Sequence, residues 1–403
     1  MAAPLEGLKV VDMGWIMVGP VSARYLAELG ATTIKVETAK RPDPLRAMGP
    51  FRNGEPGLGR SMSYHMTNAN KRSLAVDIKS ADGLRIVREL LAEADVFVES
   101  FTPGAIDEMG LSYAEVSKRN PGLVMVSTGI LGRKGPMGVG TSGTGMSGAA
   151  FAGATGLVGW PDRVPNGPHG PWTDAVAPRY IAVSVLAALH RRQATGKGVH
   201  IDLGQADAGL QFLTPAYMDY VVNGVTTERD GRAGSPLRAP CGAYPSQGED
   251  RWVVVDAAQE AAWSALREIV GEPLSDDRFS TLVGRLRARE DLDARIAAWT
   301  ARRTAEEAEA TLQAAGVPAH AIHRDVDLSE DPDLEHVSFF KPVSDPLIGE
   351  SWIPGPQFAL RRTPHAETRA GPRIGDSTDQ ILEQHLGLSP DEIGRLKASG
   401  VLT

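Results

Sequence analysis

The stretch LKVVDMGWIMVGPVSARYLAELGATTIKV, residues 8–36, decides the fold. Residues 8–12 form an apolar, β-branched run that is typical of a buried strand, and a Gly-Pro pair ends that run. Residues 21–29 follow a helical pattern that stops at a glycine, and residues 33–36 form a second strand-like run. A strand, a helix and a strand in this order predict a βαβ unit with two parallel strands.

The same alternation continues along the first half of the chain. Further strand-like runs lie at residues 74–78, 95–99, 123–127 and 199–203, and helical patterns lie at residues 81–94, 175–193 and 206–222. We therefore predict an α/β fold with a mostly parallel, doubly wound sheet. The pattern changes after residue 224, where strands at 252–255 and 318–323 and helices at 259–270, 291–301 and 304–315 predict a smaller α+β domain.

Composition excludes several classes of protein. The chain has 403 residues, of which 42% are hydrophobic and 23% charged, so it can bury a large core. Its net charge of −8 argues against bulk nucleic-acid binding. A single cysteine excludes a disulfide scaffold, and the histidines show no metal-ligand spacing. No apolar stretch is long enough to span a bilayer, and the chain starts without a signal sequence, so we expect a cytoplasmic enzyme.

The charge is unevenly distributed. Residues 1–80 contain 11 Lys and Arg against 7 Asp and Glu, which leaves a net charge of +4 there and −12 in the remainder. A basic region in an acidic protein suits a small polyanionic ligand. A solvated surface with counter-ions would explain the same composition.

A glycine-rich motif at residues 138–143 (GVGTSG) matches the dinucleotide fingerprint GxGxxG. That fingerprint requires a strand to end at its first glycine, whereas here the preceding strand is expected to end near residue 127. A loop that lets a ligand approach the backbone is the preferred interpretation, and a nicotinamide oxidoreductase is the remote one.

Asp174 follows the sequence Gly170-Pro171-Trp172-Thr173 and stands directly before the predicted helix 175–193. One interpretation is an N-cap, whose carboxylate accepts a helix N–H. The other is a nucleophile, because the helix dipole keeps the carboxylate ionised and an ionised carboxylate can attack an activated acyl carbon. The residues alone leave both interpretations open.

Short motifs along nearly the whole chain resemble the class III CoA-transferase family, which also contains α-methylacyl-CoA racemases and carnitine-type CoA-transferases. They occur in the same order as in that family: PLEGLKVVD (4–12), VGP (18–20), LGA (29–31) with IKVE (34–37), NKRS (70–73), ADV (94–96) with ESFTPG (99–104), NP (120–121), TGKG (195–198), AAGVP (314–318) and GDSTD (375–379).

The resemblance implies an architecture. A large Rossmann-like domain is built from both ends of the chain, residues 1–223 and 331–403, and residues 224–330 form a small α+β domain. It also implies an interlocked homodimer, or a heteromer with a related subunit. The composition change near residue 224 agrees with this division.

The resemblance also implies a reaction, in which CoA moves from an acyl-CoA donor to a carboxylic acid. Asp174 falls at the position of the family's catalytic aspartate, which forms a mixed anhydride and then an aspartyl-CoA thioester. The CoA thioester is a substrate, and no permanently bound cofactor is expected. Glycines within residues 138–148 are candidates for the N–H donors that the oxyanion needs.

Residues at CoA-contacting positions are carried over from the family: Met17, Val18, Val76, Asp77, Ile78, Lys79, Ser100, Phe101 and Thr102. Two positions differ. Relatives place an arginine where this chain has Thr38, so Lys40 or Arg41 is expected to contact a phosphate instead, and Glu108 stands where some relatives have a second arginine.

One departure separates the branches of the family. Racemases need a histidine at the position of Val139, and valine cannot remove a proton. The transferase is therefore preferred over the racemase. An intramolecular CoA transferase, which is an isomerase, and an inactive partner subunit of a hetero-oligomeric transferase stay open as alternatives. An aromatic or branched dicarboxylate, such as a succinate derivative, is the expected substrate.

Overall fold

The computed structural model describes residues 2–138, 140–167, 170–229, 231 and 237–403, and the chain divides into two compact units. Unit 1 consists of Met1–Leu157, Asn166–Thr227 and Glu335–Thr403. Unit 2 consists of Val158–Pro165 and Glu228–Leu334. Unit 1 therefore combines both ends of the chain.

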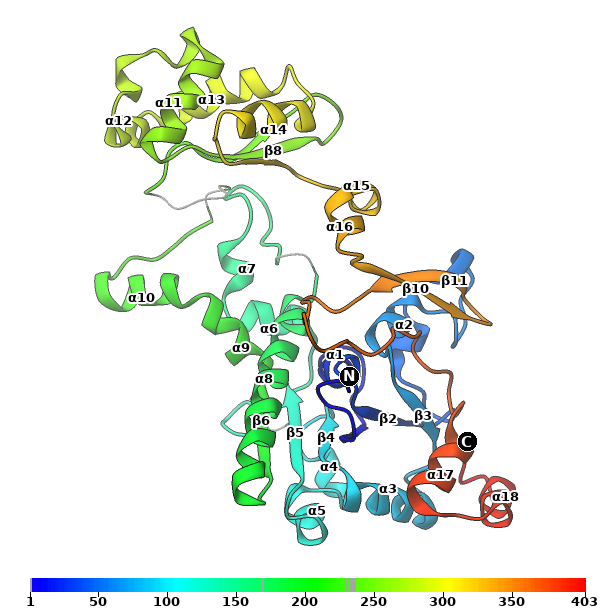
Figure 1. The fold of residues 1–403 in the computed structure, drawn as a ribbon. Coiled ribbons are helices and arrows are strands. Elements are labelled where there is room, and N and C mark those ends of the chain that lie inside the picture. Colours follow the sequence, from blue (N-terminus) through cyan, green and yellow to red (C-terminus); the bar gives the residue numbers. More distant parts are fainter. Residues whose placement is uncertain (1, 139, 168–169, 230, 232–236) are drawn as a thin grey trace. The chain divides into compact units, whose positions relative to one another are not determined.

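A six-stranded parallel sheet forms the centre of unit 1 (Figure 1). Its strand order is β3-β2-β1-β4-β5-β6, the order of doubly wound nucleotide-binding sheets. The order reverses between β1 and β4, so a crevice is expected there, outside the carboxyl ends of these strands. The strands are β1 (Lys9–Asp12), β2 (Thr32–Glu37), β3 (Arg72–Ala75), β4 (Val96–Glu99), β5 (Val124–Gly129) and β6 (Val199–Gly204).

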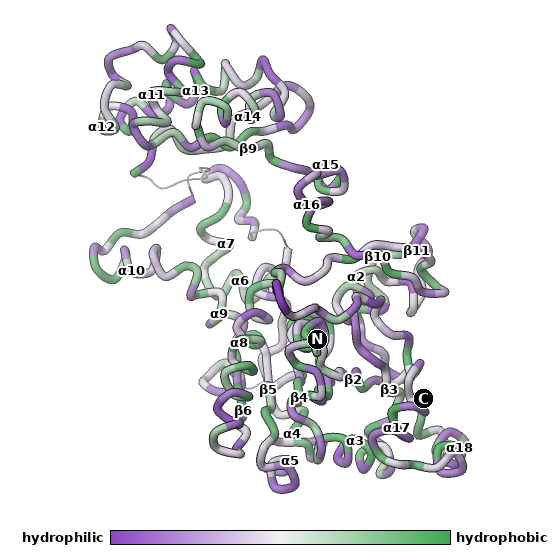
Figure 2. The backbone as a smooth tube through the Cα atoms, viewed as in Figure 1, coloured by the Kyte–Doolittle hydropathy of each residue, from purple (hydrophilic) through white to green (hydrophobic). Residues whose placement is uncertain are grey.

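Helices cover both faces of this sheet because the strands bury side chains on both faces. Val11, Phe97 and Met125 pack on one face with α3, α17 and α18, whereas Val10 and Val126 pack on the other with α1 and α8. Hydrophobic residues give way to polar ones toward the carboxyl ends of β4 and β5 (Figure 2). The helices of unit 1 are α1 (Val18–Glu28), α2 (Met62–Thr67), α3 (Ala81–Glu93), α4 (Ala105–Glu108), α5 (Tyr113–Arg119), α6 (Gly145–Phe151), α7 (Ala154–Leu157), α8 (Trp172–Thr195), α9 (Gln205–Phe212), α10 (Thr214–Asn223), α17 (Thr378–Leu386) and α18 (Pro390–Ala398).

The predicted helix 206–222 is wrong as a single element, because the structure has α9 and α10 there, separated at Leu213. Pro215 cannot donate an N–H within a helix, and it occupies the second position of α10, where no such donor is needed. The predicted strand 74–78 is shifted to Arg72–Ala75. The chain leaves the sheet at this point because the Asp77 N–H donates to the Val401 carbonyl instead of a neighbouring strand.

Unit 2 has its own core and an antiparallel sheet in the order β7-β8-β9. Trp263, Phe279 and Leu292 are among its buried side chains. Its elements are β7 (Cys241–Pro245), β8 (Trp252–Asp256), β9 (Ala319–Ala321), α11 (Glu260–Val270), α12 (Leu282–Arg287), α13 (Arg289–Thr300), α14 (Ala305–Ala314) and α15 (Asp325–Ser329). Helix α16 (Pro332–His336) spans the boundary of the units, and unit 1 also contains a hairpin of β10 (Phe340–Asp345) and β11 (Gly349–Pro354).

Within the part of the chain that the structure describes, no helix combines the length and the apolar character needed to cross a membrane.

Candidate active site

Asp174 lies in the first turn of α8, but it is not the N-cap. The helix begins at Trp172, three residues before the predicted start, and Pro171 occupies the cap position. Asp174 is therefore the third residue of the helix, where a carboxylate interacts favourably with the helix dipole. The N-cap interpretation of Asp174 is wrong, because the helix begins three residues earlier than predicted and Pro171 is the N-cap.

The Asp174 carboxylate is buried beside the start of α6. Its residue is 7% exposed, and the backbone N–H of Gly145 donates a hydrogen bond to it. A Cβ at Gly145 would lie 2.7 Å from the Asp174 Cγ, so only glycine allows this approach. Within the described residues, no lysine, arginine or histidine forms an ion pair with Asp174.

Thr173 fixes this first turn of α8 against two other helices. Its Oγ1 is 3.0 Å from the Gly145 carbonyl oxygen of α6 and 3.2 Å from Oε1 of Gln205, the first residue of α9. Gly148 and Gly209 leave room for Thr173, since a Cβ at either position would lie within 3.0 Å of its side chain. The sequence indicated Gly145 only as one of the glycines within residues 138–148 that are candidate N–H donors, and it indicated no role for Thr173 or Gln205.

Burial controls the acidity of Asp174. Removal of the carboxyl group from water raises its pKa to about 6, and the Gly145 N–H opposes this shift by stabilising the anion. At neutral pH most of the population is therefore ionised and poorly solvated. A carboxylate of this kind is a better nucleophile than one with a full hydration shell or a bound cation.

The residues predicted to contact CoA follow the carboxyl ends of four parallel strands. Such ends meet at one edge of a sheet, and α8 also starts at this edge because it leads back to β6. Val18 of α1 and Val176 of α8 belong to one buried cluster, so both helices pack on the same face of the sheet. The residues are Met17 and Val18 after β1, Lys40 and Arg41 after β2, Val76, Asp77, Ile78 and Lys79 after β3, and Ser100, Phe101 and Thr102 after β4.

These residues are not equally available to a ligand. The Val18 and Val76 side chains are buried in the core, so only their backbone groups could contact CoA. The Lys40 Nζ lies 2.7 Å from Oδ2 of Asp77, and this hydrogen bond holds the pKa of the Asp77 carboxyl below its usual range. Arg41 is exposed and lies over the ring of Trp15, 4.8 Å from its centroid.

Trp15 connects two of the predicted positions. Its ring lies edge-on to Phe101, with the centroids 5.5 Å apart, and carries Arg41 on its face. The backbone N–H of Trp15 donates a hydrogen bond to Ser100 Oγ, with the N and O atoms 2.8 Å apart. The loops after β1, β2 and β4 therefore form one continuous surface.

Two buried ion pairs stabilise the backbone next to this surface. Lys71 Nζ lies 2.7 Å from Asp12 Oδ2, and Lys35 Nζ lies 2.8 Å from Asp43 Oδ2, with all four side chains inaccessible to solvent. Asp12 also accepts the Gly14 N–H. The carboxylates of Asp12 and Asp43 therefore stabilise the fold and are not available to react with a substrate.

The glycine-rich motif does not form a dinucleotide fingerprint. β5 ends at Gly129, nine residues before Gly138, so no strand leads into the motif. Val139, on which the distinction from racemases depends, lies outside the described residues.

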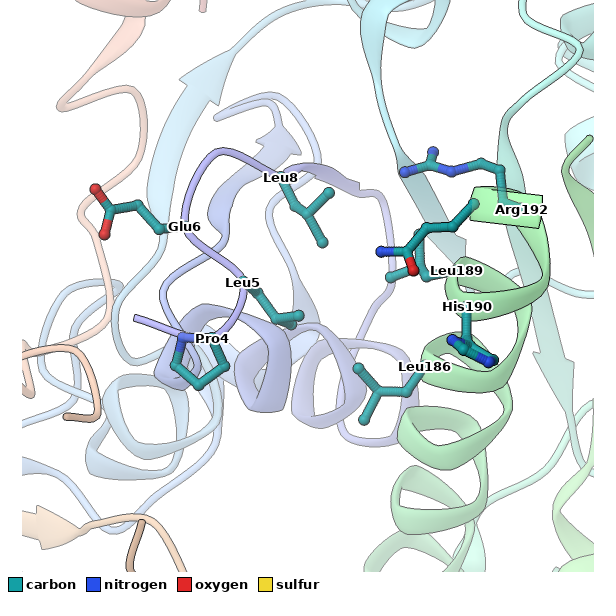
Figure 3. Close-up of a pocket in the computed structure, with 9 residues that line it drawn as sticks. Pro4, Leu5, Glu6, Leu8, Leu186, Leu189, His190 and Arg192 are labelled. Atoms are coloured by element: carbon teal, nitrogen blue, oxygen red, sulfur yellow. The ribbon is translucent and has the colours of Figure 1, made fainter. Parts of the chain in front are cut away.

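A cavity of about 320 Å³ lies between the N-terminal segment and the second half of α8 (Figure 3). Figure 3 shows Leu5 and Leu8 of the segment facing Leu186 and Leu189 of α8. This part of α8 is roughly 20 Å along the helix from Asp174, given a rise of about 1.5 Å per residue. The cavity is therefore not part of the candidate active site.

A doubly wound α/β sheet with a buried carboxylate at its carboxyl edge, unpaired among the described residues, is consistent with an enzyme of acyl transfer. Residues 5–378 match the family described as CoA-transferase family III, and the chain belongs to this family. It is accordingly a family III CoA-transferase enzyme, which acts on acyl-CoA.

Two relatives and one structure illustrate the similarity. The chain is 31% identical to succinyl-CoA–D-citramalate CoA-transferase of Chloroflexus aurantiacus over 99% of this chain and 98% of that protein. It is 29% identical to mouse succinyl-CoA:glutarate CoA-transferase, over 99% and 90% of the two chains. A CaiB/BaiF family protein from Brucella suis has a similar crystal structure, with a TM-score of 0.86, 28% identity and coverage of 96% and 100%.

Proposed function

We propose that this enzyme transfers CoA from a dicarboxylic acyl-CoA, such as succinyl-CoA, to a second carboxylic acid, with Asp174 as the nucleophile. The observation that carries the proposal is the Asp174 carboxylate itself, which is buried, has no cationic partner among the described residues and accepts the Gly145 N–H. The donor class is supported by the two relatives described above, which are both named for succinyl-CoA.

The reaction balances through four substitutions at acyl carbon. An oxygen of Asp174 attacks the thioester carbonyl and CoA thiolate leaves, which gives a mixed anhydride. The thiolate attacks the Asp174 carbonyl and releases the donor acid, so that CoA is held as an aspartyl thioester. The acceptor carboxylate attacks this thioester and releases the thiolate. The thiolate then attacks the acceptor carbonyl, and the Asp174 carboxylate is regenerated.

The loops at the carboxyl edge are proposed to bind CoA. Because Lys40 is already paired with Asp77, Arg41 is the preferred contact for a phosphate. Residues 1–223 and 331–403 are proposed to act together as the CoA-binding domain, and residues 224–330 as the small domain.

Mass spectrometry with hydroxylamine trapping tests the nucleophile. The protein is incubated with succinyl-CoA and hydroxylamine, and a hydroxamate on the peptide that contains Asp174 is expected. The matched control is Asp207, which is the third residue of α9 just as Asp174 is the third residue of α8, but is exposed. A hydroxamate on Asp207, or labelling unchanged in Asp174→Ala, would contradict the proposal. Assays with D-citramalate, L-malate and glutarate then identify the acceptor.

A second copy of the chain is proposed to cover an apolar surface on α8, α9 and α10, in an interlocked homodimer. Large hydrophobic side chains are exposed there: Tyr180, Val183, Leu210, Phe212, Tyr217, Met218, Tyr220, Val221 and Val222. Patches of this extent mark interfaces. Light scattering of the purified chain should give twice 42.9 kDa. A monomer would favour a heteromer, as in the relatives that are named alpha and beta subunits of a succinyl-CoA–L-malate CoA-transferase.

A further inference from the structure

Ile16 has a backbone conformation that is unfavourable for its side chain. Its φ is 64°, in the left-handed region, where a β-branched residue is a genuine outlier. Within the described part of the chain, Ile16 is the only β-branched residue among the non-glycine residues with positive φ, which are Ile16, Asn53, Asn70, Asp250 and Ser338. Glycine would adopt this conformation without strain.

Core packing does not explain the isoleucine, because the residue is 37% exposed. The surrounding structure nevertheless enforces the strained backbone. The Ile16 N–H donates to Asp43 Oδ1 at 3.0 Å, and Asp43 is held in turn by the buried Lys35. On the preceding residue, Ser100 Oγ accepts the Trp15 N–H at 2.8 Å and donates to the Trp15 carbonyl at 3.2 Å.

The position of Ile16 indicates what the exposed side chain contacts. It follows β1, one of the two strands between which the order of the sheet reverses, and ligands of doubly wound sheets bind in the crevice at this point. Ile16 stands two residues before Val18, and Asp174 stands two residues before Val176, while Val18 and Val176 pack in one cluster. Ile16 and Asp174 thus each stand two residues before a member of this cluster, at the carboxyl edge of the same sheet.

We propose that Ile16 is a specificity-determining residue, whose side chain packs against the acyl-thioester end of the bound acyl-CoA. The left-handed backbone presents an apolar group to the substrate, and the Asp43–Lys35 pair below it prevents the loop from relaxing. This proposal rests on the proposed function, since it requires acyl-CoA to bind at the carboxyl edge of the sheet.

Stability and affinity, measured together, test the proposal. Ile16→Gly removes the side chain and the strain, so its Tm is expected to equal or exceed that of the parent protein. Its Kd for succinyl-CoA, measured by calorimetry in an Asp174→Ala background that prevents turnover, should be about tenfold weaker, as expected for the loss of roughly 50 Å² of apolar contact. Its Kd for CoA alone should change by less than about threefold.

Two variants serve as controls. Ile16→Val keeps a β-branched side chain and should bind succinyl-CoA within about threefold of the parent. Asn53→Gly relieves a positive φ at an exposed position in the turn Arg52–Gly54, outside the loops that follow β1 and β4, and should leave both affinities unchanged.

Three other outcomes would contradict the assignment of Ile16 as a specificity-determining residue. An unchanged Kd for succinyl-CoA in Ile16→Gly would show that the side chain contacts no substrate. A lower Tm would show that the isoleucine serves folding. Equal losses of affinity for CoA and succinyl-CoA would place the contact away from the acyl group. If the parent protein binds neither compound, the proposed function itself fails, and this result is separate from any difference between the variants.

Discussion

Asp12 at the end of β1 and Asp43 after β2 are buried carboxylates, as is Asp174 in the first turn of α8, but the two regions balance the negative charge in different ways. Asp12 and Asp43 each contact a lysine that is inaccessible to solvent, and both also accept backbone N–H groups. Asp174 has the Gly145 N–H, and no cation pairs with it among the described residues. A paired carboxylate stabilises a loop, whereas an unpaired one keeps an oxygen available for reaction at a cost in folding free energy.

The largest expected effect concerns the unpaired carboxylate. Asp174→Asn should reduce the rate of CoA transfer by at least about 10³-fold, because an amide cannot form the anhydride. Transfer from succinyl-CoA, followed by chromatography of the CoA esters, measures it. Asp207→Asn is the matched control and should keep full activity. If Asp174→Asn still transfers CoA, Asp174 is not the nucleophile, and its lack of a cationic partner has no catalytic meaning.

The same variant should also be more stable. The folded-state pKa of Asp174, about 6, is above the ordinary value, so the penalty of ionising the buried carboxyl is absent below the unfolded-state pKa and complete above pH 6. Asp174→Asn should therefore increase the free energy of unfolding at pH 8 by up to about 3 kcal/mol, and by less at pH 5. Urea titrations at both pH values measure this difference.

Removal of the lysine from a buried ion pair should lower the free energy of unfolding. Lys71→Met leaves Asp12 buried without its partner and should lower the free energy of unfolding by about 3–5 kcal/mol. Lys118→Met, which breaks an exposed pair with Glu115, should change it by less than about 1 kcal/mol. Equal effects of the two substitutions in urea titrations would contradict the structural role of the buried pairs.

A substitution of Gly145, which hydrogen-bonds to Asp174, should reduce activity less than a substitution of Asp174 itself. Gly145→Ala places a methyl group 2.7 Å from the Asp174 Cγ and should displace the carboxylate, with a loss of about 10–100-fold in kcat/KM. Gly156→Ala in α7 is the control, because no atom lies within 4 Å of the added Cβ. Activity of Gly145→Ala equal to that of Gly156→Ala would show that the approach of α6 is not needed.

The smallest expected effect is that of pH on the intact enzyme. The nucleophile must be ionised, so kcat/KM should rise with pH through the Asp174 pKa of about 6 and be about tenfold lower at pH 5 than at pH 8. A profile that is flat over this range would show that Asp174 is either not the nucleophile or not desolvated as the structure has it.

Much of the fold could be predicted from the sequence because its signals are local. The apolar runs that became β1, β2, β4, β5 and β6 were recognised to within two residues, as was α3. The helix predicted over 206–222 was wrong because an apolar period continues across Pro215, while the missing N–H divides the helix. The strand near residue 74 was shifted because its last residues pair with the C-terminus, which no local pattern shows.

The candidate site was only partly predictable. The sequence singled out Asp174 as a candidate by its motif and its place before a predicted helix, but most of the residues that surround it are far away in the sequence. Gly145, Thr173 and Gln205 meet only when three helices pack, and two of them precede or follow Asp174 by about 30 residues. Trp15 carried no signal that it would link Arg41 to Phe101.

The sequence by itself determined the alternation of strands and helices, the candidate nucleophile and the family, because apolar periodicity and ordered motifs are properties of short segments. The tertiary structure alone decided which carboxylates are paired, that Asp174 is buried with a raised pKa, and that Ile16 is held in a left-handed conformation. The reason is physical. Desolvation, ion pairing and enforced strain depend on which distant groups come within a few ångströms, and that is settled only when the sheet and its helices pack together.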